Sequence, residues 1–274
     1  MEPSLKSITT PSKKSDLRFY YGNDKSQFAD LYIPNGKGPF PVIIGIHGGW
    51  WRSEYDLSTH SHLCNWFKDH GIAAWNIEYR RVDKHRSAWP FCGEDIIKAI
   101  NYLDILGSNF NLDLENCCII GFSAGSQLAT WVTHKYSADK NIINITIKKT
   151  ISLAGAVDLD MCDKLQLSNY SVRDFFGIDF KPSIKLLAQA CPSHLGRSTV
   201  PIHIFHGLFD TSIPACVSKS YFQKLVNNNS NCELKIFTNA THFQLIDPNS
   251  PYWPDIYDVV FSALNVTSHK LILK

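Results

Sequence analysis

Short apolar runs alternate with stretches of helical periodicity along most of the chain. Eight segments carry the continuous or alternating apolar pattern of β-strands: Leu17–Tyr21, Phe28–Ile33, Val42–His47, Ile72–Ile77, Cys117–Ile120, Thr150–Leu153, Ile202–Phe205 and Leu234–Phe237. Apolar residues at helical spacing predict helices over Leu57–His70, Phe91–Leu106, Ser126–Lys135 and Val217–Val226. Strands that alternate with helices indicate an α/β fold, with a mostly parallel sheet of about eight strands and helices on both faces.

Three intervals depart from this rhythm. The turn composition of residues 22–24 predicts an antiparallel hairpin between the first two strands. Residues 158–197 hold only short helix-like pieces. We interpret them as a candidate helical lid over the carboxyl ends of the strands, with an ordinary crossover as the alternative. The polar residues 1–16 are expected to be a mobile segment, and residues 17–274 a single domain.

The composition excludes several classes of protein. The chain has 274 residues, 44% of them hydrophobic, and a net charge of +2, which excludes a disordered chain and gives no electrostatic footprint for nucleic acid. No apolar run has the length of a membrane span or of a signal-peptide core. We therefore expect a cytoplasmic protein whose eight cysteines are reduced thiols. No pattern predicts the oligomeric state.

A serine follows the strand predicted at Cys117–Ile120. The segment 121–125 reads Gly-Phe-Ser-Ala-Gly, which fits the G-x-S-x-G pattern, and a helix is predicted directly after it. In that strand–turn–helix setting the serine is lifted onto a sharp turn at the sheet edge. Side chains at Gly121 or Gly125 would crowd this turn. Ser123 is therefore the candidate nucleophile, and a turn without chemical consequence is the alternative.

A serine hydroxyl needs an oriented base, and on this fold the expected order along the chain is serine, acid, histidine. Asp210 follows the strand at 202–205, and His242 follows the strand at 234–237. We expect His242 to take the Ser123 proton and Asp210 to orient the imidazole. Asp158 is a rival for the acid, and Asp247 is a weaker rival.

The sequence 47–50, His-Gly-Gly-Trp, follows the strand Val42–His47. A loop of this type supplies half of an oxyanion hole. We expect the N–H of Gly49, with that of Trp50, and the N–H of Ala124 to bind the oxyanion. His47 is expected to orient the loop through a hydrogen bond.

Aromatic residues cluster around this predicted site and are expected to line a substrate pocket, although each of them also fits a structural core. They are Trp50, Trp51, Phe122, Phe209 and Phe243. The remaining histidines have spacings unsuited to a shared metal ion, and no dinucleotide or phosphate-binding motif occurs. No metal or other cofactor is implied.

These motifs together resemble the α/β-hydrolase superfamily over about residues 17–262. Within it the chain is similar to the HGGxW-containing esterases, which include feruloyl-esterase-like proteins, hormone-sensitive-lipase-like carboxylesterases and kynurenine formamidases. The segments that carry the resemblance are 47–50, 121–125, 205–210 (Phe-His-Gly-Leu-Phe-Asp) and 241–243 (Thr-His-Phe). The segments 76–81 (Asn-Ile-Glu-Tyr-Arg-Arg) and 242–248 (His-Phe-Gln-Leu-Ile-Asp-Pro) resemble feruloyl-esterase-like proteins. Ser126 and Gln127 depart from the glycine-rich pattern that often follows the serine, so altered helix packing is expected there.

The resemblance implies a serine carboxylesterase acting on small, partly aromatic esters through an acyl-enzyme. The alternative is an arylformamidase that hydrolyses N-formylkynurenine, which the HGGxW motif favours. A peptidase with an added propeller domain does not fit the chain length. A non-catalytic binding protein of this fold is disfavoured by the intact Ser123, Asp210 and His242.

Overall fold

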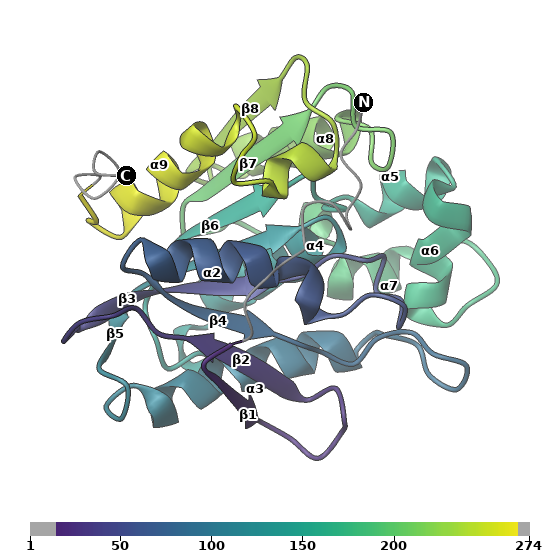
Figure 1. Ribbon diagram of the computed structural model, residues 1–274. Helices are drawn as coiled ribbons and strands as arrows, with labels where there is room; N and C mark the ends of the chain where they lie inside the picture. The colour runs from purple at the N-terminus through teal and green to yellow at the C-terminus, as the bar shows by residue number, and fades with distance from the viewer. Residues whose placement is uncertain (1–14, 268–274) are drawn as a thin grey trace.

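The computed structural model describes residues 15–267. Eight strands form one sheet in the order β1-β2-β4-β3-β5-β6-β7-β8 (Figure 1). Their bounds are β1 Leu17–Tyr20, β2 Phe28–Tyr32, β3 Phe40–Ile46, β4 Ala73–Ile77, β5 Leu112–Phe122, β6 Ile147–Leu153, β7 Ile202–Gly207 and β8 Cys232–Phe237. The pairs β1–β2 and β2–β4 are antiparallel, and all other pairs are parallel. The expected eight strands and the antiparallel edge are confirmed.

Helices cover both faces of this sheet (Figure 1). The α-helices are α2 Ser61–Asp69, α3 Phe91–Leu106, α4 Ala124–Ala138, α5 Leu159–Lys164, α6 Leu167–Phe176, α7 Ile184–Ala190, α8 Cys216–Asn227 and α9 Trp253–Ala263. Short 3₁₀ turns are η1 Leu57–His60, η2 Lys140–Ile142, η3 Pro192–His194 and η4 Phe243–Ile246. The sequence analysis did not predict α9, and α4 begins two residues earlier than expected.

The two faces of the sheet pack into separate apolar clusters because successive strand side chains point to opposite sides. In β3, Val42 and Ile44 belong to the cluster that includes α3, α4 and α8, whereas Ile43 packs with α2 and α9. Cys117 and Cys118 in β5 divide in the same way, and both are buried free thiols. Continuous apolar strands are therefore what a sheet covered on both faces requires.

The expected mobile segment over residues 1–16 lies outside the described residues, apart from its last two. Of those two, Asp16 forms an ion pair with Lys68. Within residues 15–267 no helix is long and apolar enough to cross a bilayer.

Candidate active site

Ser123 lies on a strained turn between β5 and α4. Its backbone angles are φ 55° and ψ −121°, a conformation that costs energy for a residue with a side chain. The turn is held because the Ser123 N–H donates to the Leu153 carbonyl at 2.9 Å. A Cβ on Gly121 would lie 2.5 Å from the Gly125 carbonyl oxygen, and one on Gly125 would overlap the carbonyl oxygen of Ile46. Both glycines are therefore required by close backbone approach.

His242 and Asp210 form a buried pair beside this turn. Nδ1 of His242 lies 2.6 Å from Oδ2 of Asp210. The other carboxylate oxygen accepts the N–H groups of Ser212 and Ile213 at 2.9 and 2.7 Å. The phenyl ring of Phe122, next to Ser123, lies 4.7 Å from the imidazole ring of His242. The structure thus brings the predicted serine, acid and histidine to one edge of the sheet.

A second histidine also contacts the Asp210 carboxylate. Nε2 of His206 lies 3.2 Å from Oδ2 of Asp210 and 2.8 Å from the Ile213 carbonyl, while its Nδ1 contacts the Ser218 hydroxyl at 2.7 Å. Burial alone raises the pKa of Asp210, but the hydrogen bonds from His206 and His242 outweigh it and hold that pKa well below its usual range. Asp210 is therefore ionised, and it fixes the Nδ1–H tautomer of His242.

The two rival acids have other partners. Asp158 caps α5 by accepting the Met161 N–H at 3.1 Å, and it also accepts the Ser220 hydroxyl at 2.7 Å. Asp247 accepts the Asn249 N–H at 2.9 Å in the turn that follows η4. Asp158 thus holds the start of α5 and a side chain of α8, and Asp247 holds a local turn, whereas Asp210 contacts His242.

The loop after β3 turns its backbone toward the same place. Gly49 and Trp50 have φ values of 111° and 53°, and the Gly49 carbonyl accepts the Arg52 N–H at 3.0 Å. Within the described residues, no protein acceptor contacts the N–H of Gly49 or of Trp50. The N–H of Ala124 stands at the first position of α4, where helical partners are lacking. The role of these three N–H groups as oxyanion donors stays a prediction.

A pocket of about 130 Å³ lies against Ser123, His242 and the Gly49–Trp50 backbone. Its lining residues come from the loop after β3, from η1, from the turn at Ser123 and from the loops after β7 and β8. They are Gly48, Gly49, Trp50, Tyr55, Thr59, Phe122, Ser123, Ser212, His242 and Phe243. Three predicted aromatic residues, Trp50, Phe122 and Phe243, thus line it. Tyr55, Thr59 and Ser212 were not predicted, because no local sequence motif includes them.

Two other predicted pocket residues, Trp51 and Phe209, do not line this pocket. Trp51 is fully buried in the core, where its indole N–H donates to Gln127 at 3.0 Å and its ring packs on Phe175. Phe209 is 57% exposed on the surface. Chain proximity to Trp50 and Asp210 suggested both positions, but the neighbouring side chains on these loops diverge.

The start of α4 and the candidate lid, residues 158–197, contact residues next to the site but do not line the pocket. Gln127 accepts the Trp51 indole N–H and donates to the Ala190 carbonyl at 2.8 Å, which links α4 to α7. The altered helix packing expected at Ser126 and Gln127 stays a prediction. No residue within 158–197 lines the pocket. Instead Arg52 donates to Ser168 at 3.0 Å and pairs with Asp174 at 2.9 Å, both in α6. A role of this interval as a lid stays a prediction.

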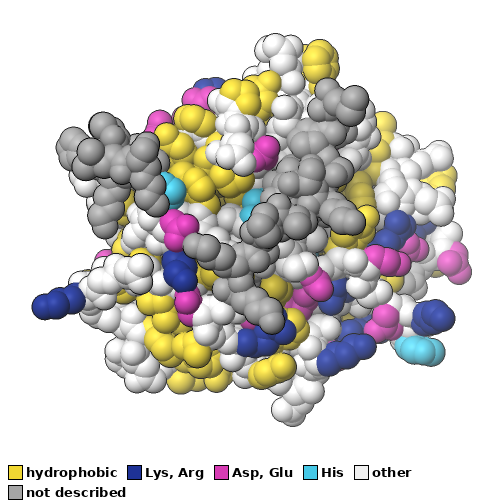
Figure 2. Space-filling view, in the orientation of Figure 1, with side chains coloured by type: hydrophobic (Ala, Val, Ile, Leu, Met, Phe, Trp, Pro, Cys, Tyr) yellow, Lys and Arg dark blue, Asp and Glu magenta, His cyan; other side chains and the backbone are white. Residues whose placement is uncertain are grey.

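The face of the molecule drawn in Figure 2 carries charges of both signs. Among the described side chains drawn in Figure 2, Lys and Arg are interspersed with Asp and Glu, and no large patch of one sign is visible on that face. This agrees with the small net charge of +2.

The architecture defines the class of the protein. A mostly parallel eight-stranded sheet, with a serine on a strained turn after β5 and helices on both faces, is the α/β-hydrolase fold. Residues 29–225 match the BD-FAE family, so the chain belongs to that family of α/β-hydrolases, which resembles the feruloyl esterases.

Two curated plant proteins are similar to this chain. A probable isoprenylcysteine alpha-carbonyl methylesterase of Oryza sativa subsp. japonica is 25% identical over 82% of this chain and 56% of its own length. The isoprenylcysteine alpha-carbonyl methylesterase of Arabidopsis thaliana is 24% identical over 96% of this chain and 65% of its own length. The chain thus spans between half and two thirds of the length of these relatives.

Solved structures of low identity share the fold. Esterase B from Lactobacillus rhamnosis, inhibited by a tributyrin phosphonate, superposes with a TM-score of 0.78 at 16% identity, over 98% of this chain and 94% of that one. An acetyl ester-xyloside bifunctional hydrolase from Caldicellulosiruptor lactoaceticus gives a TM-score of 0.75 at 18% identity, over 93% and 98%.

Proposed function

We propose that this protein is a serine carboxylesterase that cleaves small esters through an acyl-enzyme on Ser123. The observation that carries this proposal is the shared pocket of Ser123, His242 and the Gly49 and Trp50 backbone, next to the 2.6 Å contact between His242 and Asp210. A nucleophile, an oriented base and unpaired N–H donors are the parts that acyl transfer needs.

The reaction follows from these positions. His242 accepts the Ser123 proton while Oγ attacks the ester carbonyl, and the resulting oxyanion binds the N–H groups of Gly49, Trp50 and Ala124. His242 then gives the proton to the leaving alkoxide, and an acyl-enzyme remains. Water, deprotonated by His242, attacks this ester and releases the acid, which restores Ser123. Asp210 stabilises the imidazolium that forms in both halves.

The pocket supports small substrate groups. Its volume of about 130 Å³ is below the roughly 300–1,000 Å³ of many ligand sites, so it encloses one small acyl or alkoxy group and leaves the rest of the ester outside. Aromatic rings of Trp50, Phe122 and Phe243 favour an uncharged group there. Two relatives are named as isoprenylcysteine alpha-carbonyl methylesterases, and the small alkoxy group of a methyl ester agrees with the proposal.

The test compares substrates on purified protein. We expect turnover of p-nitrophenyl acetate and of an isoprenylcysteine methyl ester, falling steeply for p-nitrophenyl octanoate. N-formylkynurenine is the substrate that tests the formamidase alternative. If its turnover exceeded ester turnover by orders of magnitude, the proposal would be overturned. Ser123→Ala should lower kcat by about 10⁴-fold or more and abolish labelling by a fluorophosphonate. Labelling of that variant would mean that another residue is the nucleophile.

A further inference from the structure

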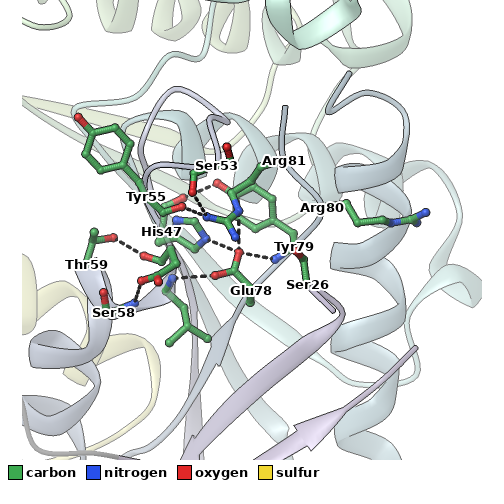
Figure 3. A network of polar contacts seen from close by, with 12 residues as sticks. Ser26, His47, Ser53, Tyr55, Ser58, Thr59, Glu78, Tyr79, Arg80 and Arg81 are labelled. Carbon is green, nitrogen blue, oxygen red and sulfur yellow. Dashed lines mark hydrogen bonds and ion pairs between the residues drawn. The ribbon is translucent and has the colours of Figure 1, made fainter. Parts of the chain in front are cut away.

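A buried carboxylate that the proposed reaction does not use lies beneath the oxyanion loop, residues 47–50. Glu78 follows β4 directly and is 1% exposed. Its Oε1 lies 3.1 Å from Nε2 of His47, 3.0 Å from the Tyr79 N and 3.0 Å from Nε of Arg81, and its Oε2 accepts the Leu57 N–H at 3.0 Å. Figure 3 shows these contacts converging on Glu78. Glu78 therefore connects four separate backbone and side-chain groups around the oxyanion loop.

The contacts of Glu78 require that it is ionised. Burial alone raises its pKa, but the charges of His47 and Arg81 and the hydrogen bonds that it accepts lower that pKa below the usual range of a glutamate. Its partners His47, Leu57 and Tyr79 all approach with nitrogen atoms that can donate. Glu78 is therefore an acceptor in every one of these contacts.

His47 lies between two groups that can only accept hydrogen bonds. Its Nε2 faces the Glu78 carboxylate at 3.1 Å, and its Nδ1 faces the Gly48 carbonyl oxygen at 2.7 Å. A neutral imidazole has one N–H and satisfies only one of these acceptors, whereas an imidazolium satisfies both. The geometry thus requires the doubly protonated ring, which Glu78 stabilises as its counter-ion.

The orientation of the Gly48 carbonyl decides where the Gly49 N–H points. Both groups belong to one trans peptide unit, in which C=O and N–H point in opposite directions. Because the Gly48 carbonyl is turned onto the His47 ring, the Gly49 N–H is turned away from that ring, and both glycines line the pocket. A rotated peptide would present a carbonyl oxygen to the developing oxyanion instead.

Two more contacts connect Glu78 to the pocket wall. Arg81, its ion-pair partner, donates to the carbonyl of Tyr55, whose side chain packs so closely on Gly49 that a Cβ there would overlap it. Figure 3 shows the Tyr55 ring directed away from the network. The Leu57 N–H, which Glu78 accepts, begins η1, and η1 carries the pocket residue Thr59.

We propose that Glu78 is a positioning residue that holds His47 as an imidazolium and so keeps the Gly49 N–H directed at the oxyanion of the reaction. This inference rests on the proposed esterase function. Glu78 touches neither the pocket nor the reacting atoms, and it acts through His47 and the Gly48–Gly49 peptide. Because an oxyanion exists in the transition state and not in the bound ester, loss of Glu78 should lower kcat and leave KM nearly unchanged.

The chain contains a matched control in Asp95. This carboxylate is also fully buried, and it pairs with Arg80 through contacts of 2.8 and 2.7 Å and accepts from Gln27 at 2.7 Å. Arg80 extends away from the Glu78 network in Figure 3. Removing the charge of Asp95 therefore perturbs a similar buried ion pair without touching the oxyanion loop.

The experiment measures Glu78→Gln and Asp95→Asn against the unaltered protein. Steady-state kinetics use p-nitrophenyl acetate, and a trifluoromethyl ketone, which forms an oxyanion on the attacking serine, is the inhibitor. We expect Glu78→Gln to lower kcat by about 10²–10³-fold, to weaken inhibition comparably and to change KM by less than about threefold. Asp95→Asn should keep kcat and inhibition within about threefold, whatever its effect on Tm.

Equal losses of kcat in the two variants, or unchanged inhibition in Glu78→Gln, would overturn the inference. If Glu78→Gln does not fold, His47→Gln decides, because a neutral amide cannot replace the imidazolium between two acceptors. Wild-type kcat in His47→Gln would then overturn the inference. Absence of ester turnover in the unaltered protein would instead refute the proposed function, and the inference with it.

Discussion

Two buried carboxylates, Asp210 and Glu78, each hold a histidine in a different half of the site. Asp210 contacts Nδ1 of His242 at 2.6 Å, and Glu78 contacts Nε2 of His47 at 3.1 Å. Each carboxylate also accepts two backbone N–H groups. The local chemistry of the two pairs is therefore much alike.

The difference between the pairs lies in the second ring nitrogen. His242 lines the pocket, so its remaining nitrogen is available to exchange a proton with Ser123. His47 is fully buried, and its remaining nitrogen is occupied by the Gly48 carbonyl. In the reaction that we propose, the first carboxylate–histidine pair moves protons, and the second fixes the backbone of the oxyanion loop. The partners of a histidine, more than its carboxylate, decide its role.

The largest expected effect concerns the acid of the proton-transfer half. Asp210→Asn should lower kcat by about 10⁴-fold, because an amide cannot stabilise the imidazolium and can select the wrong tautomer of His242. Asp158→Asn is the control, since Asp158 caps α5, and it should leave kcat within about threefold. Steady-state kinetics on p-nitrophenyl acetate measure both, and a larger loss for Asp158→Asn would move the acid there.

A smaller loss is expected in the oxyanion half. Gly49→Ala introduces a Cβ where φ is 111° and where the Tyr55 side chain leaves no space. We expect kcat to fall by about 10²–10³-fold, as for loss of one oxyanion donor. Gly196→Ala is the control, because no atom lies within 4 Å of the added Cβ. Full activity of Gly49→Ala would rule out a strict requirement for this backbone.

Asp210 and Glu78 should also make the free energy of unfolding depend on pH. Their pKa values are lowered in the folded state, so each stabilises the fold above the unfolded-state pKa of about 4, and this contribution is lost as the pH falls through the folded-state pKa. The stability difference between the unaltered protein and Asp210→Asn, measured by urea unfolding, should shrink by about 1 kcal/mol between pH 7 and pH 3. A difference independent of pH would contradict the lowered pKa.

The smallest effect separates pocket residues from surface ones. Phe243→Ala removes a ring from the pocket and should raise KM several-fold for p-nitrophenyl acetate. Phe209→Ala changes an exposed side chain and should alter neither KM nor kcat by more than about twofold. A large effect of Phe209→Ala would mean that substrate extends over that surface.

The sequence predicted the parts of the fold that local patterns specify. All eight strands follow from their apolar runs, and the turn at Ser123 follows from Gly121 and Gly125. Helix α9 was missed although Trp253, Ile256 and Val260 stand at helical spacing, so a signal was present. In α6, Ser168 has a left-handed backbone conformation, and its side chain accepts a hydrogen bond from Arg52. A tertiary contact of this kind cannot be read from a local sequence pattern.

In the candidate site, too, some residues were predicted from local sequence patterns and others depend on tertiary contacts. Ser123, Asp210 and His242 were predicted because their order along the chain and their positions after strands are fixed by the fold. Glu78 was not predicted, because its role depends on β4 lying beside β3, on Arg81 and on the ring orientation of His47. Trp51 and Phe209 were misplaced because adjacency in sequence does not determine where a loop side chain points.

The most direct test of the account is a crystal structure of the protein after reaction with a p-nitrophenyl alkylphosphonate. The account predicts a covalent bond from phosphorus to Oγ of Ser123, with one phosphonate oxygen about 2.7–3.1 Å from the N atoms of Gly49 and Ala124. It also predicts that the Gly48 carbonyl remains on His47. Phosphorus on another residue, or a phosphonate oxygen directed away from Gly49, would contradict it.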